Sequence, residues 1–259
     1  MPIHLQAKPG DYAPTVIIPG DPIRATKIAA RFDGGLETTR QVNANRGLVG
    51  YTGTVDGTPV SVQVTMMGSP TTGIVVEELL MLGVQTIIRV GTTGAFPPLQ
   101  IGDVVVATAA AGWTGFANVV SGGEPSAPAA DLDVVLALRE AAQAKGLTPH
   151  AGPIVTSDTF YGDPHPDGVT RWGRRGYLSV EMESAALFLL AMRERAKGRK
   201  VRAGSILTVS DVLFYPESPE AAGVDGKAFF RPPEDEVNAR VDKTIGAALA
   251  AAAALGKAG

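Results

Sequence analysis

The sequence contains no cysteine and only three histidines, His4, His150 and His165, which are scattered along the chain. The absence of cysteine excludes disulfide bonds and thiolate metal sites. Three scattered histidines argue against a histidine-rich metal site. We therefore expect no bound metal.

Long apolar runs are also missing. No stretch of about 18 uncharged apolar residues predicts a membrane span, and the alanine-rich tail from Ile245 is too short and too weakly apolar. The N-terminal segment MPIHLQAKPGDYAP lacks the apolar region of a signal peptide. We expect a cytoplasmic protein that has no membrane partner.

The excess of charge is small, with a formal net charge of −3. A general nucleic-acid binder would show a basic surplus, so we expect no nucleic-acid partner. Hydrophobic residues make up 45% of the 259 residues and charged residues 19%. This composition supports a sizeable core.

Strand-like and helix-like segments alternate along the chain. Thr15 to Ile18 is a β-branched strand that runs into the turn PGDP and a helix from Ile23 to Ala30. Asp56-Gly57, between two β-like runs, predicts a hairpin. We infer a single α/β domain, residues 1–259, with a mixed central β-sheet flanked by helices.

Two stretches rich in glycine are predicted as loops. Gly91 to Gly94 follows the strand Val84–Val90, and Gly112 to Pro128 is a longer loop. Ser69 is predicted to be the N-cap of a helix that extends to Leu82.

Charged residues stand at several predicted strand ends, where ligands bind in α/β proteins. Gly20 and Arg24, at the start of a helix, form a plausible anion site. Arg89 ends a buried strand and needs a partner, either a structural carboxylate or a phosphate held together with Thr92 and loop N–H groups. Asp211 follows the strand Ala203–Val209.

Two glutamates, Glu181 and Glu183, lie between a strand-like lead and an apolar helix. A period of two places both on one side, with Met182 opposite. They are expected either to cap the helix, whose dipole favours acidic groups, or to accept hydrogen bonds from the vicinal hydroxyls of a ribose.

Several ordered segments together resemble the nucleoside phosphorylase family, closest to the hexameric bacterial purine nucleoside phosphorylases. The segments are PGDPIRA (19–25), NRG (45–47), MGSP (67–70), VEELLMLG (76–83), IIRVGTTGA (87–95), SDTFY (157–161), VEMESAAL (180–187) and TVSD (208–211). The resemblance covers residues 4 to 212.

The resemblance implies a role for each matching residue. It assigns phosphate binding to Gly20, Arg24, Arg46, Arg89 and Thr92; ribose binding to His4, Met67, Met182 and Glu183; base binding to Thr93, Gly94, Phe160, Val180, Glu181 and Ser210; and proton donation to Asp211. Arg46 and His4 are expected to serve a neighbouring subunit's site. The implied assembly is a homohexamer built as a trimer of dimers.

The resemblance also implies an activity, the phosphorolysis of purine ribonucleosides or deoxyribonucleosides in nucleoside salvage. The enzyme would be a pentosyltransferase that uses inorganic phosphate as co-substrate and no cofactor. Uridine phosphorylases share these motifs, but they usually carry a Gln and an Arg that read uracil. Pro164 and Pro166 occupy those offsets here, while Ser210-Asp211 matches the purine enzymes.

Uridine phosphorylase is therefore the alternative activity. A nucleosidase of the same fold would not need the phosphate arginines Arg24, Arg46 and Arg89. A non-catalytic nucleoside-binding protein would normally be exported. The arginine that assists the acid in the purine family has only a weak counterpart, Arg231.

Overall fold

A computed structural model of the chain describes residues 1–161, 165, 168–215, 229–230 and 232–257. The first half contains β1 (Thr15–Ile18), α1 (Pro22–Ala29), β2 (Arg40–Asn43), β3 (Gly50–Val55), β4 (Thr58–Gln63), α2 (Ser69–Met81) and β5 (Thr86–Ala95). The second half contains β6 (Val104–Trp113), α3 (Gly115–Val120), α4 (Leu132–Ala144), β7 (Pro149–Ser157), β8 (Ser179–Glu181), α5 (Ser184–Ala196), β9 (Arg202–Leu213), β10 (Phe229–Phe230) and α7 (Glu234–Lys257). The described residues also form three 3₁₀ helices: η1 (Gly35–Glu37), η2 (Asn45–Gly47) and η3 (Gly168–Arg175).

Within the described residues, ten strands form one mixed sheet in the order β10-β9-β6-β7-β8-β5-β1-β4-β3-β2. Strand β9 pairs with β5 as well as with β6, so β5, β8, β7, β6 and β9 close into a ring. Strands β1, β4, β3 and β2 extend from β5 as an open sheet, whereas the short β10 pairs with the end of β9. The predicted mixed α/β fold is confirmed.

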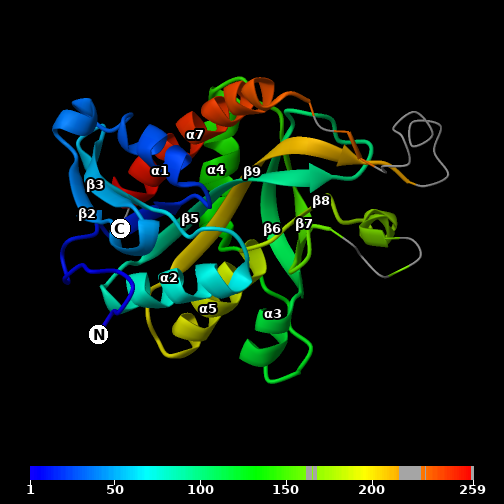
Figure 1. Ribbon diagram of the computed structural model, residues 1–259, viewed down its shortest axis with the longest axis horizontal. Coiled ribbons are helices and arrows are strands. Elements are labelled where there is room, and N and C mark those ends of the chain that lie inside the picture. Colours follow the sequence, from blue (N-terminus) through cyan, green and yellow to red (C-terminus); the bar gives the residue numbers. More distant parts are fainter. Residues whose placement is uncertain (162–164, 166–167, 216–228, 231, 258–259) are drawn as a thin grey trace.

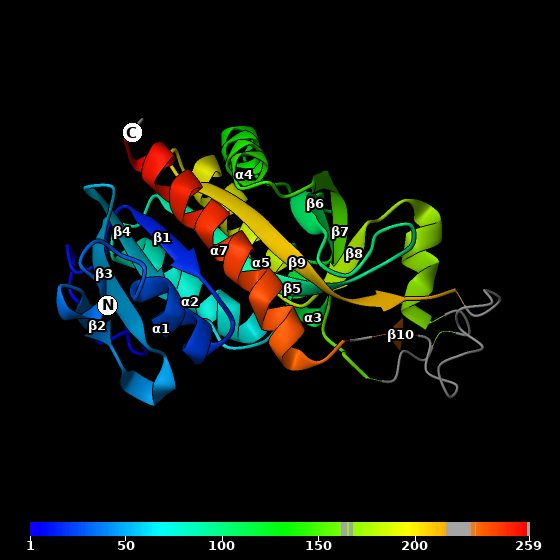
Figure 2. The same cartoon turned by 90° about the horizontal axis from the view of Figure 1, so that it is seen from above.

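Helices cover both faces of the sheet. Helices α2 and α5 pack together on one face, and α4 and α7 pack together on the other (Figures 1 and 2). The central strand β1 is buried on both faces, and Val16, Ile17 and Ile18 have no exposed surface. A continuous β-branched run suits such a strand because no side faces water. No helix among the described residues is long and apolar enough to cross a membrane.

The Asp56-Gly57 hairpin forms as predicted. Both residues have positive φ, 49° and 72°, which is the combination that a type I′ turn requires. The strands on either side of the turn are Gly50–Val55 and Thr58–Gln63. The N-cap of α2 is Gly68 rather than Ser69, which already lies inside the helix.

The two glycine-rich segments predicted as loops differ most from the prediction. Residues Gly91 to Gly94 belong to β5, because β9 pairs with that strand over its whole length. Residues 112–128 include the end of β6 and the helix α3, whose N-cap Thr114 accepts a hydrogen bond from the Ala117 N–H. Long-range pairing overrides the turn preference of glycine in the first case.

The C-terminal end of α5 is fixed by a buried carboxylate. Glu194 is 4% exposed and accepts hydrogen bonds from Lys197 and Arg199, both at 2.7 Å. The bonds from Lys197, Arg199 and Arg193 hold the pKa of Glu194 at about 2, below its ordinary value of 4.5. Arg193 also pairs with Glu77 at 2.6 Å, which ties α5 to α2.

We predict that Glu194→Gln lowers the free energy of unfolding at pH 7. Because the pKa is depressed in the folded state, this stabilisation is present above about pH 4.5 and is lost as the pH falls towards 2. The cationic partners are partly exposed, so solvent screening limits the expected loss to about 1 kcal/mol. Urea denaturation at pH 7 and near pH 2 measures it.

The matched control is Glu37→Gln, because Glu37 is exposed and its substitution should leave stability unchanged. An equal difference between wild type and Glu194→Gln at both pH values would contradict the assignment.

Candidate functional site

A cavity of about 540 Å³ opens at the carboxyl ends of β1, β7 and β8, beside Arg89 of β5 and Asp211 of β9. Ligands in α/β proteins bind at such strand ends. The predicted site residues in its lining are Gly20, Arg24, Met67, Arg89, Thr92, Thr93, Gly94, Phe160, Val180, Glu181, Met182, Glu183, Ser210 and Asp211. The structure therefore brings together segments that are nearly 200 residues apart in the sequence.

Other lining residues were not predicted as site residues: Asp21, Pro22, Met66, Trp113, Ser157, Thr159, Tyr161, Val169 and Leu213. Asp21 and Pro22 directly follow Gly20, so proximity in the sequence was the signal for them. Trp113 is the last residue of β6 and lies in a stretch that was predicted as a loop. A longer predicted strand would have placed Trp113 at a strand's carboxyl end, where ligands bind.

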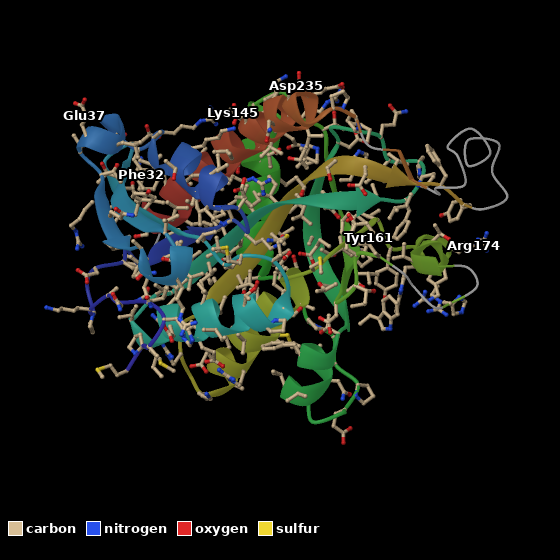
Figure 3. The ribbon with its side chains drawn as sticks, viewed as in Figure 1. Phe32, Glu37, Lys145, Tyr161, Arg174 and Asp235 are labelled. Carbon is tan, nitrogen blue, oxygen red and sulfur yellow. The ribbon has the colours of Figure 1, made fainter. Side chains whose placement is uncertain are left out.

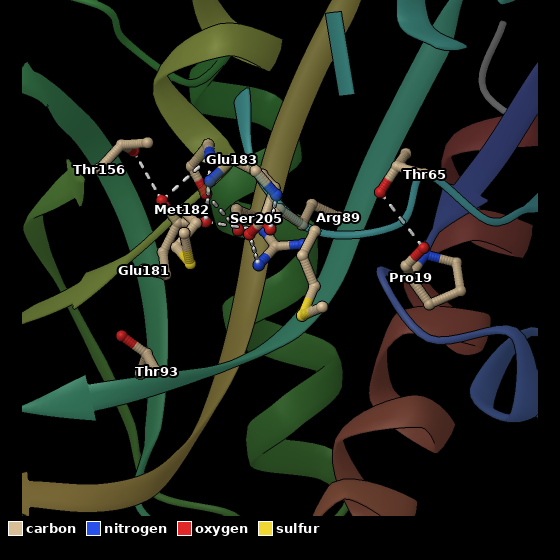
Figure 4. A network of polar contacts seen from close by, with 12 residues as sticks. Pro19, Thr65, Arg89, Thr93, Thr156, Glu181, Met182, Glu183 and Ser205 are labelled. Carbon is tan, nitrogen blue, oxygen red and sulfur yellow. Dashed lines mark hydrogen bonds and ion pairs between the residues drawn. The ribbon is translucent and has the colours of Figure 1, made fainter. Parts of the chain in front are cut away.

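Arg89 lies at the centre of a buried charge cluster (Figure 4). Its Nε donates to Glu181 Oε2 at 2.8 Å, and its Nη2 pairs with Glu183 Oε2. The three side chains are 5%, 1% and 6% exposed. Of the two partners that the sequence left open for Arg89, the structure supplies the structural carboxylate, and it supplies two.

The pKa values of this cluster follow from burial and from the unequal number of charges. Burial lowers the pKa of Arg89, but Glu183 and Glu181 more than offset this and raise it overall. Burial raises the pKa of Glu183; Arg89 opposes this rise and Glu181 adds to it. Two carboxylates share one guanidinium, so the cluster carries an excess of negative charge.

The two glutamates differ in whether their side chains cap α5. Glu181 accepts hydrogen bonds from the N–H groups of Glu183 and Ser184 at 3.0 Å, so it caps α5. Glu183 stands at the N-cap position, but its side chain makes no capping bond. Its Oε1 instead accepts from the Gly68 N–H at 2.7 Å.

Asp211 reaches the cavity through an irregularity in β9. Thr93 pairs with Val209 and Gly94 with Asp211, so Ser210 is an extra residue between them. A bulge of this kind redirects side chains, and Ser210 and Asp211 both line the cavity although they are consecutive. The Ser210 hydroxyl donates to Asp211 Oδ1 at 2.7 Å.

Gly94 leaves room for this carboxyl group. A Cβ atom at position 94 would lie 2.6 Å from Asp211 Oδ2, closer than non-bonded atoms approach. The resemblance assigned Gly94 to the base site, and the structure shows that any side chain there would displace Asp211.

The residues predicted to bind an anion come from the turn after β1, from α1 and from β5. Arg24 is half-buried in the first turn of α1, and the Asp21 side chain caps this helix by accepting from the Ile23 N–H at 2.8 Å. Thr92 lies in β5, in the ladder with β9. The backbone there is in a strand rather than a loop, but β1 pairs with β5 only as far as Arg89 and β8 only from Gly94, so the contribution of the N–H groups between them stays a prediction.

His4 and Arg46 do not line the cavity of their own chain. The Asn45 side chain donates to His4 O at 2.9 Å, which joins the two segments, and His4 Nδ1 lies 2.8 Å from Glu78. Arg46 is exposed and has a φ of 56°. A non-glycine residue held in the left-handed region stores strain of a kind that clusters at functional sites.

Large exposed side chains stand at the rim of the cavity. Met67 is 78%, Phe160 63% and Tyr161 83% exposed, and Figure 3 shows Tyr161 and Arg174 in the half of the molecule away from Phe32 and Glu37. The rings of Phe160 and Tyr161 pack edge to face, with their centroids 4.9 Å apart. Pro164, Pro166 and Arg231, on which the choice of base and acid depended, lie outside the described residues.

Comparison with known proteins agrees with this geometry. The profile of the Phosphorylase superfamily matches residues 14–253. A DeoD-type purine nucleoside phosphorylase of Geobacillus sp. (strain WCH70) is 43% identical over 223 residues, which cover 85% of this chain and 91% of that protein. DeoD-type purine nucleoside phosphorylases of Caldanaerobacter subterraneus subsp. tengcongensis and Clostridium perfringens (strain ATCC 13124) are each 40% identical, over 85% and 84% of this chain and 92% and 89% of those proteins. Both the profile and these relatives span most of the chain, which therefore belongs to the phosphorylase superfamily.

Proposed function

We propose that this protein is a purine nucleoside phosphorylase, a pentosyltransferase that converts a purine ribonucleoside or deoxyribonucleoside and inorganic phosphate into the free base and the pentose 1-phosphate. The observation that carries the proposal is that one cavity holds Arg24, Arg89, Glu183 and Asp211. The relatives named as purine nucleoside phosphorylases support it. A role in nucleoside salvage follows from this reaction.

In the proposed reaction, phosphate attacks the anomeric carbon while the bond to the purine breaks. The transition state resembles that of glycoside hydrolysis, with positive charge on the sugar ring. Arg24 and Arg89 orient the phosphate, with Gly20 and Thr92 beside it. The purine leaves as a neutral base when Asp211 donates a proton to N7. No cofactor takes part.

Glu183 is suited to hold the ribose. Its two oxygens accept from Gly68 N–H and from Arg89, and a carboxylate has about four acceptor sites. The remaining sites suit the vicinal hydroxyls of a ribose, with Met67 and Met182 against the sugar. Thr93, Gly94, Phe160, Val180 and Ser210 remain the predicted surroundings of the base.

The charge of the cavity supports a site that two subunits complete. Among the described lining residues, Arg24 and Arg89 are the cations, while Asp21, Glu181, Glu183 and Asp211 are acidic. A phosphate anion needs more positive charge than this. Arg46, exposed and outside its own chain's cavity, is a suitable donor to a neighbour's site, and His4 lies beside its loop.

We accordingly propose self-association through twofold contacts, within a hexamer built as a trimer of dimers. The cytoplasmic location stays a prediction.

A phosphate-dependent assay of adenosine, inosine, guanosine and uridine tests the function. We expect release of the purine bases only when phosphate is present, and little release of uracil. Base release without phosphate would indicate a nucleosidase instead. Nucleoside binding without any base release would indicate a non-catalytic binding protein, and preference for uridine would indicate the alternative phosphorylase.

We predict that Asp211→Asn slows adenosine phosphorolysis by about 10²–10⁴-fold, the usual loss when a general acid is removed. Inosine should lose less, because its 6-oxo group accepts a hydrogen bond from the asparagine amide. A 7-methylated purine nucleoside is already cationic and should react nearly as fast as with wild type. Steady-state rates on the three substrates measure this, and equal losses on all three would show that Asp211 is not the acid.

We predict that Arg46→Ala and Asp211→Asn each lose most of their activity on adenosine but complement one another on this substrate when mixed. In a twofold dimer, the site that combines the Asp211 of one chain with the Arg46 of the other is wild type. Random exchange at equal amounts should restore about a quarter of wild-type activity, because half of the pairs are mixed and each has one intact site. Light scattering supplies the control, since a fully active monomer would refute the shared site.

A further inference from the structure

The two glutamates that hold Arg89 differ in how many donors they already accept. Among the described residues, Glu183 accepts from the Gly68 N–H and from Arg89, and a backbone hydrogen bond with Met182 also acts on it. Glu181 accepts from Arg89 Nε at 2.8 Å, from Thr156 Oγ1 at 2.6 Å and from two backbone N–H groups at 3.0 Å (Figure 4). The same side chain, two positions apart, is therefore placed in two different hydrogen-bonding environments.

Counting acceptor sites separates the two roles. An ionised carboxylate offers about four lone-pair sites. Oε1 of Glu181 accepts from Thr156 and Ser184, and Oε2 accepts from Arg89, Glu183 and Ser184. These donors occupy the acceptor capacity of Glu181, which leaves nothing to accept a hydrogen from a purine.

We propose that Glu181 does not read the base but is a positioning residue, which sets the orientation of the Arg89 guanidinium for phosphate. This inference rests on the proposed function, because it takes phosphate as the ligand of Arg89. The guanidinium is planar with N–H donors in a fixed fork, so a bond at Nε fixes the direction of the remaining donors.

The surroundings of Arg89 leave the guanidinium little freedom. A Cβ atom at Gly91 would lie 2.7 Å from Arg89 Nη2, so the glycine makes room for the guanidinium in this one position. The carboxylate of Glu181 is held by two further elements. The Thr156 hydroxyl on β7 donates to it, and so does the Ser184 N–H at the N-terminus of α5. Glu181 thereby links β5, β7 and α5.

Thr156 provides a test that does not touch the substrate. It is fully buried and is not part of the cavity lining. Its hydroxyl donates to Glu181 and accepts from the Ala185 N–H at 2.9 Å. An effect of Thr156 on phosphate must therefore pass through Glu181 or through the start of α5, and the comparison with Glu181→Gln identifies the route through Glu181.

The experiment compares Glu181→Gln, Thr156→Val and Thr156→Ser with wild type, using inorganic phosphate and three purine nucleosides. In Glu181→Gln an amide N–H₂ replaces one acceptor oxygen, so a donor that faced Glu181 loses its partner. We expect the KM for phosphate to rise about tenfold or more, as the loss of one charged hydrogen bond implies. The KM for each nucleoside should stay within about twofold, equally for adenosine, inosine and guanosine.

The threonine variants should follow the same pattern. Thr156→Val should raise the KM for phosphate in the same direction but by less, about threefold, since a neutral donor is lost. Thr156→Ser keeps the hydroxyl and should restore a value near wild type. Glu77→Gln, the same substitution at a glutamate paired with Arg193 outside the cavity, is the matched control and should change neither constant.

Titration calorimetry with inorganic phosphate gives a second measurement, on protein whose folding is checked by near-ultraviolet circular dichroism. Weaker phosphate binding in folded Glu181→Gln and Thr156→Val supports the proposal. A loss that differs between bases, with phosphate binding unchanged, would show that Glu181 reads the base. A lowered melting temperature with both KM values unchanged would show a merely structural role, and either result overturns the proposal.

The two proposals fail differently. If wild type releases purine without phosphate, the proposed function is wrong, and calorimetry with inorganic phosphate still shows whether Glu181 orients Arg89. If wild type depends on phosphate but Glu181→Gln binds it normally, only the positioning role is wrong. Should Glu181→Gln fail to fold, Thr156→Val carries the same test.

Discussion

The buried guanidinium of Arg89 between two carboxylates is the interaction on which the rest of the site depends. Burying three charged side chains carries a large desolvation cost, and removing one partner would leave the others uncompensated. Hydrogen bonds to the two carboxylates offset this cost. Their donors come from several elements: the N-terminus of α5, Thr156 on β7 and the Gly68 N–H before α2. The closed ring of strands holds β5, β7 and β8 at the separation this cluster needs.

The excess of negative charge in this cluster shapes how an anion is accepted. On the proposed function, a phosphate that approaches Arg89 meets a guanidinium already paired with two carboxylates, so further cations are needed to hold it. Arg24 lies in the same cavity, and the proposed contribution of a neighbour's Arg46 adds another. On this proposal, assembly supplies charge that a single chain does not place at its own site, and catalysis becomes tied to oligomerisation.

The sequence predicted much of this architecture because local patterns decide it. The β-branched run of β1 and the Asp56-Gly57 turn have local causes, and the period of two correctly placed Glu181 and Glu183 on one side, where both meet Arg89. The features that the sequence did not predict depend on pairing between strands far apart in the chain. Gly91 to Gly94 read as a loop from composition, yet β9 extends the strand through them. The same pairing creates the bulge at Ser210 that turns Asp211 into the cavity, and no local signal marks it.

The different hydrogen-bonding environments of the two glutamates could not be predicted from the sequence. Glu181 and Glu183 share a residue type, a segment, burial and a common partner, so no property of the motif separates them. They differ in which distant groups donate to them: Thr156 lies 25 residues from Glu181, and Gly68 lies 115 residues from Glu183. Their remaining acceptor capacity is therefore a property of the folded chain. On the proposals made above, this capacity distinguishes the carboxylate that binds a ribose from the one that holds an arginine.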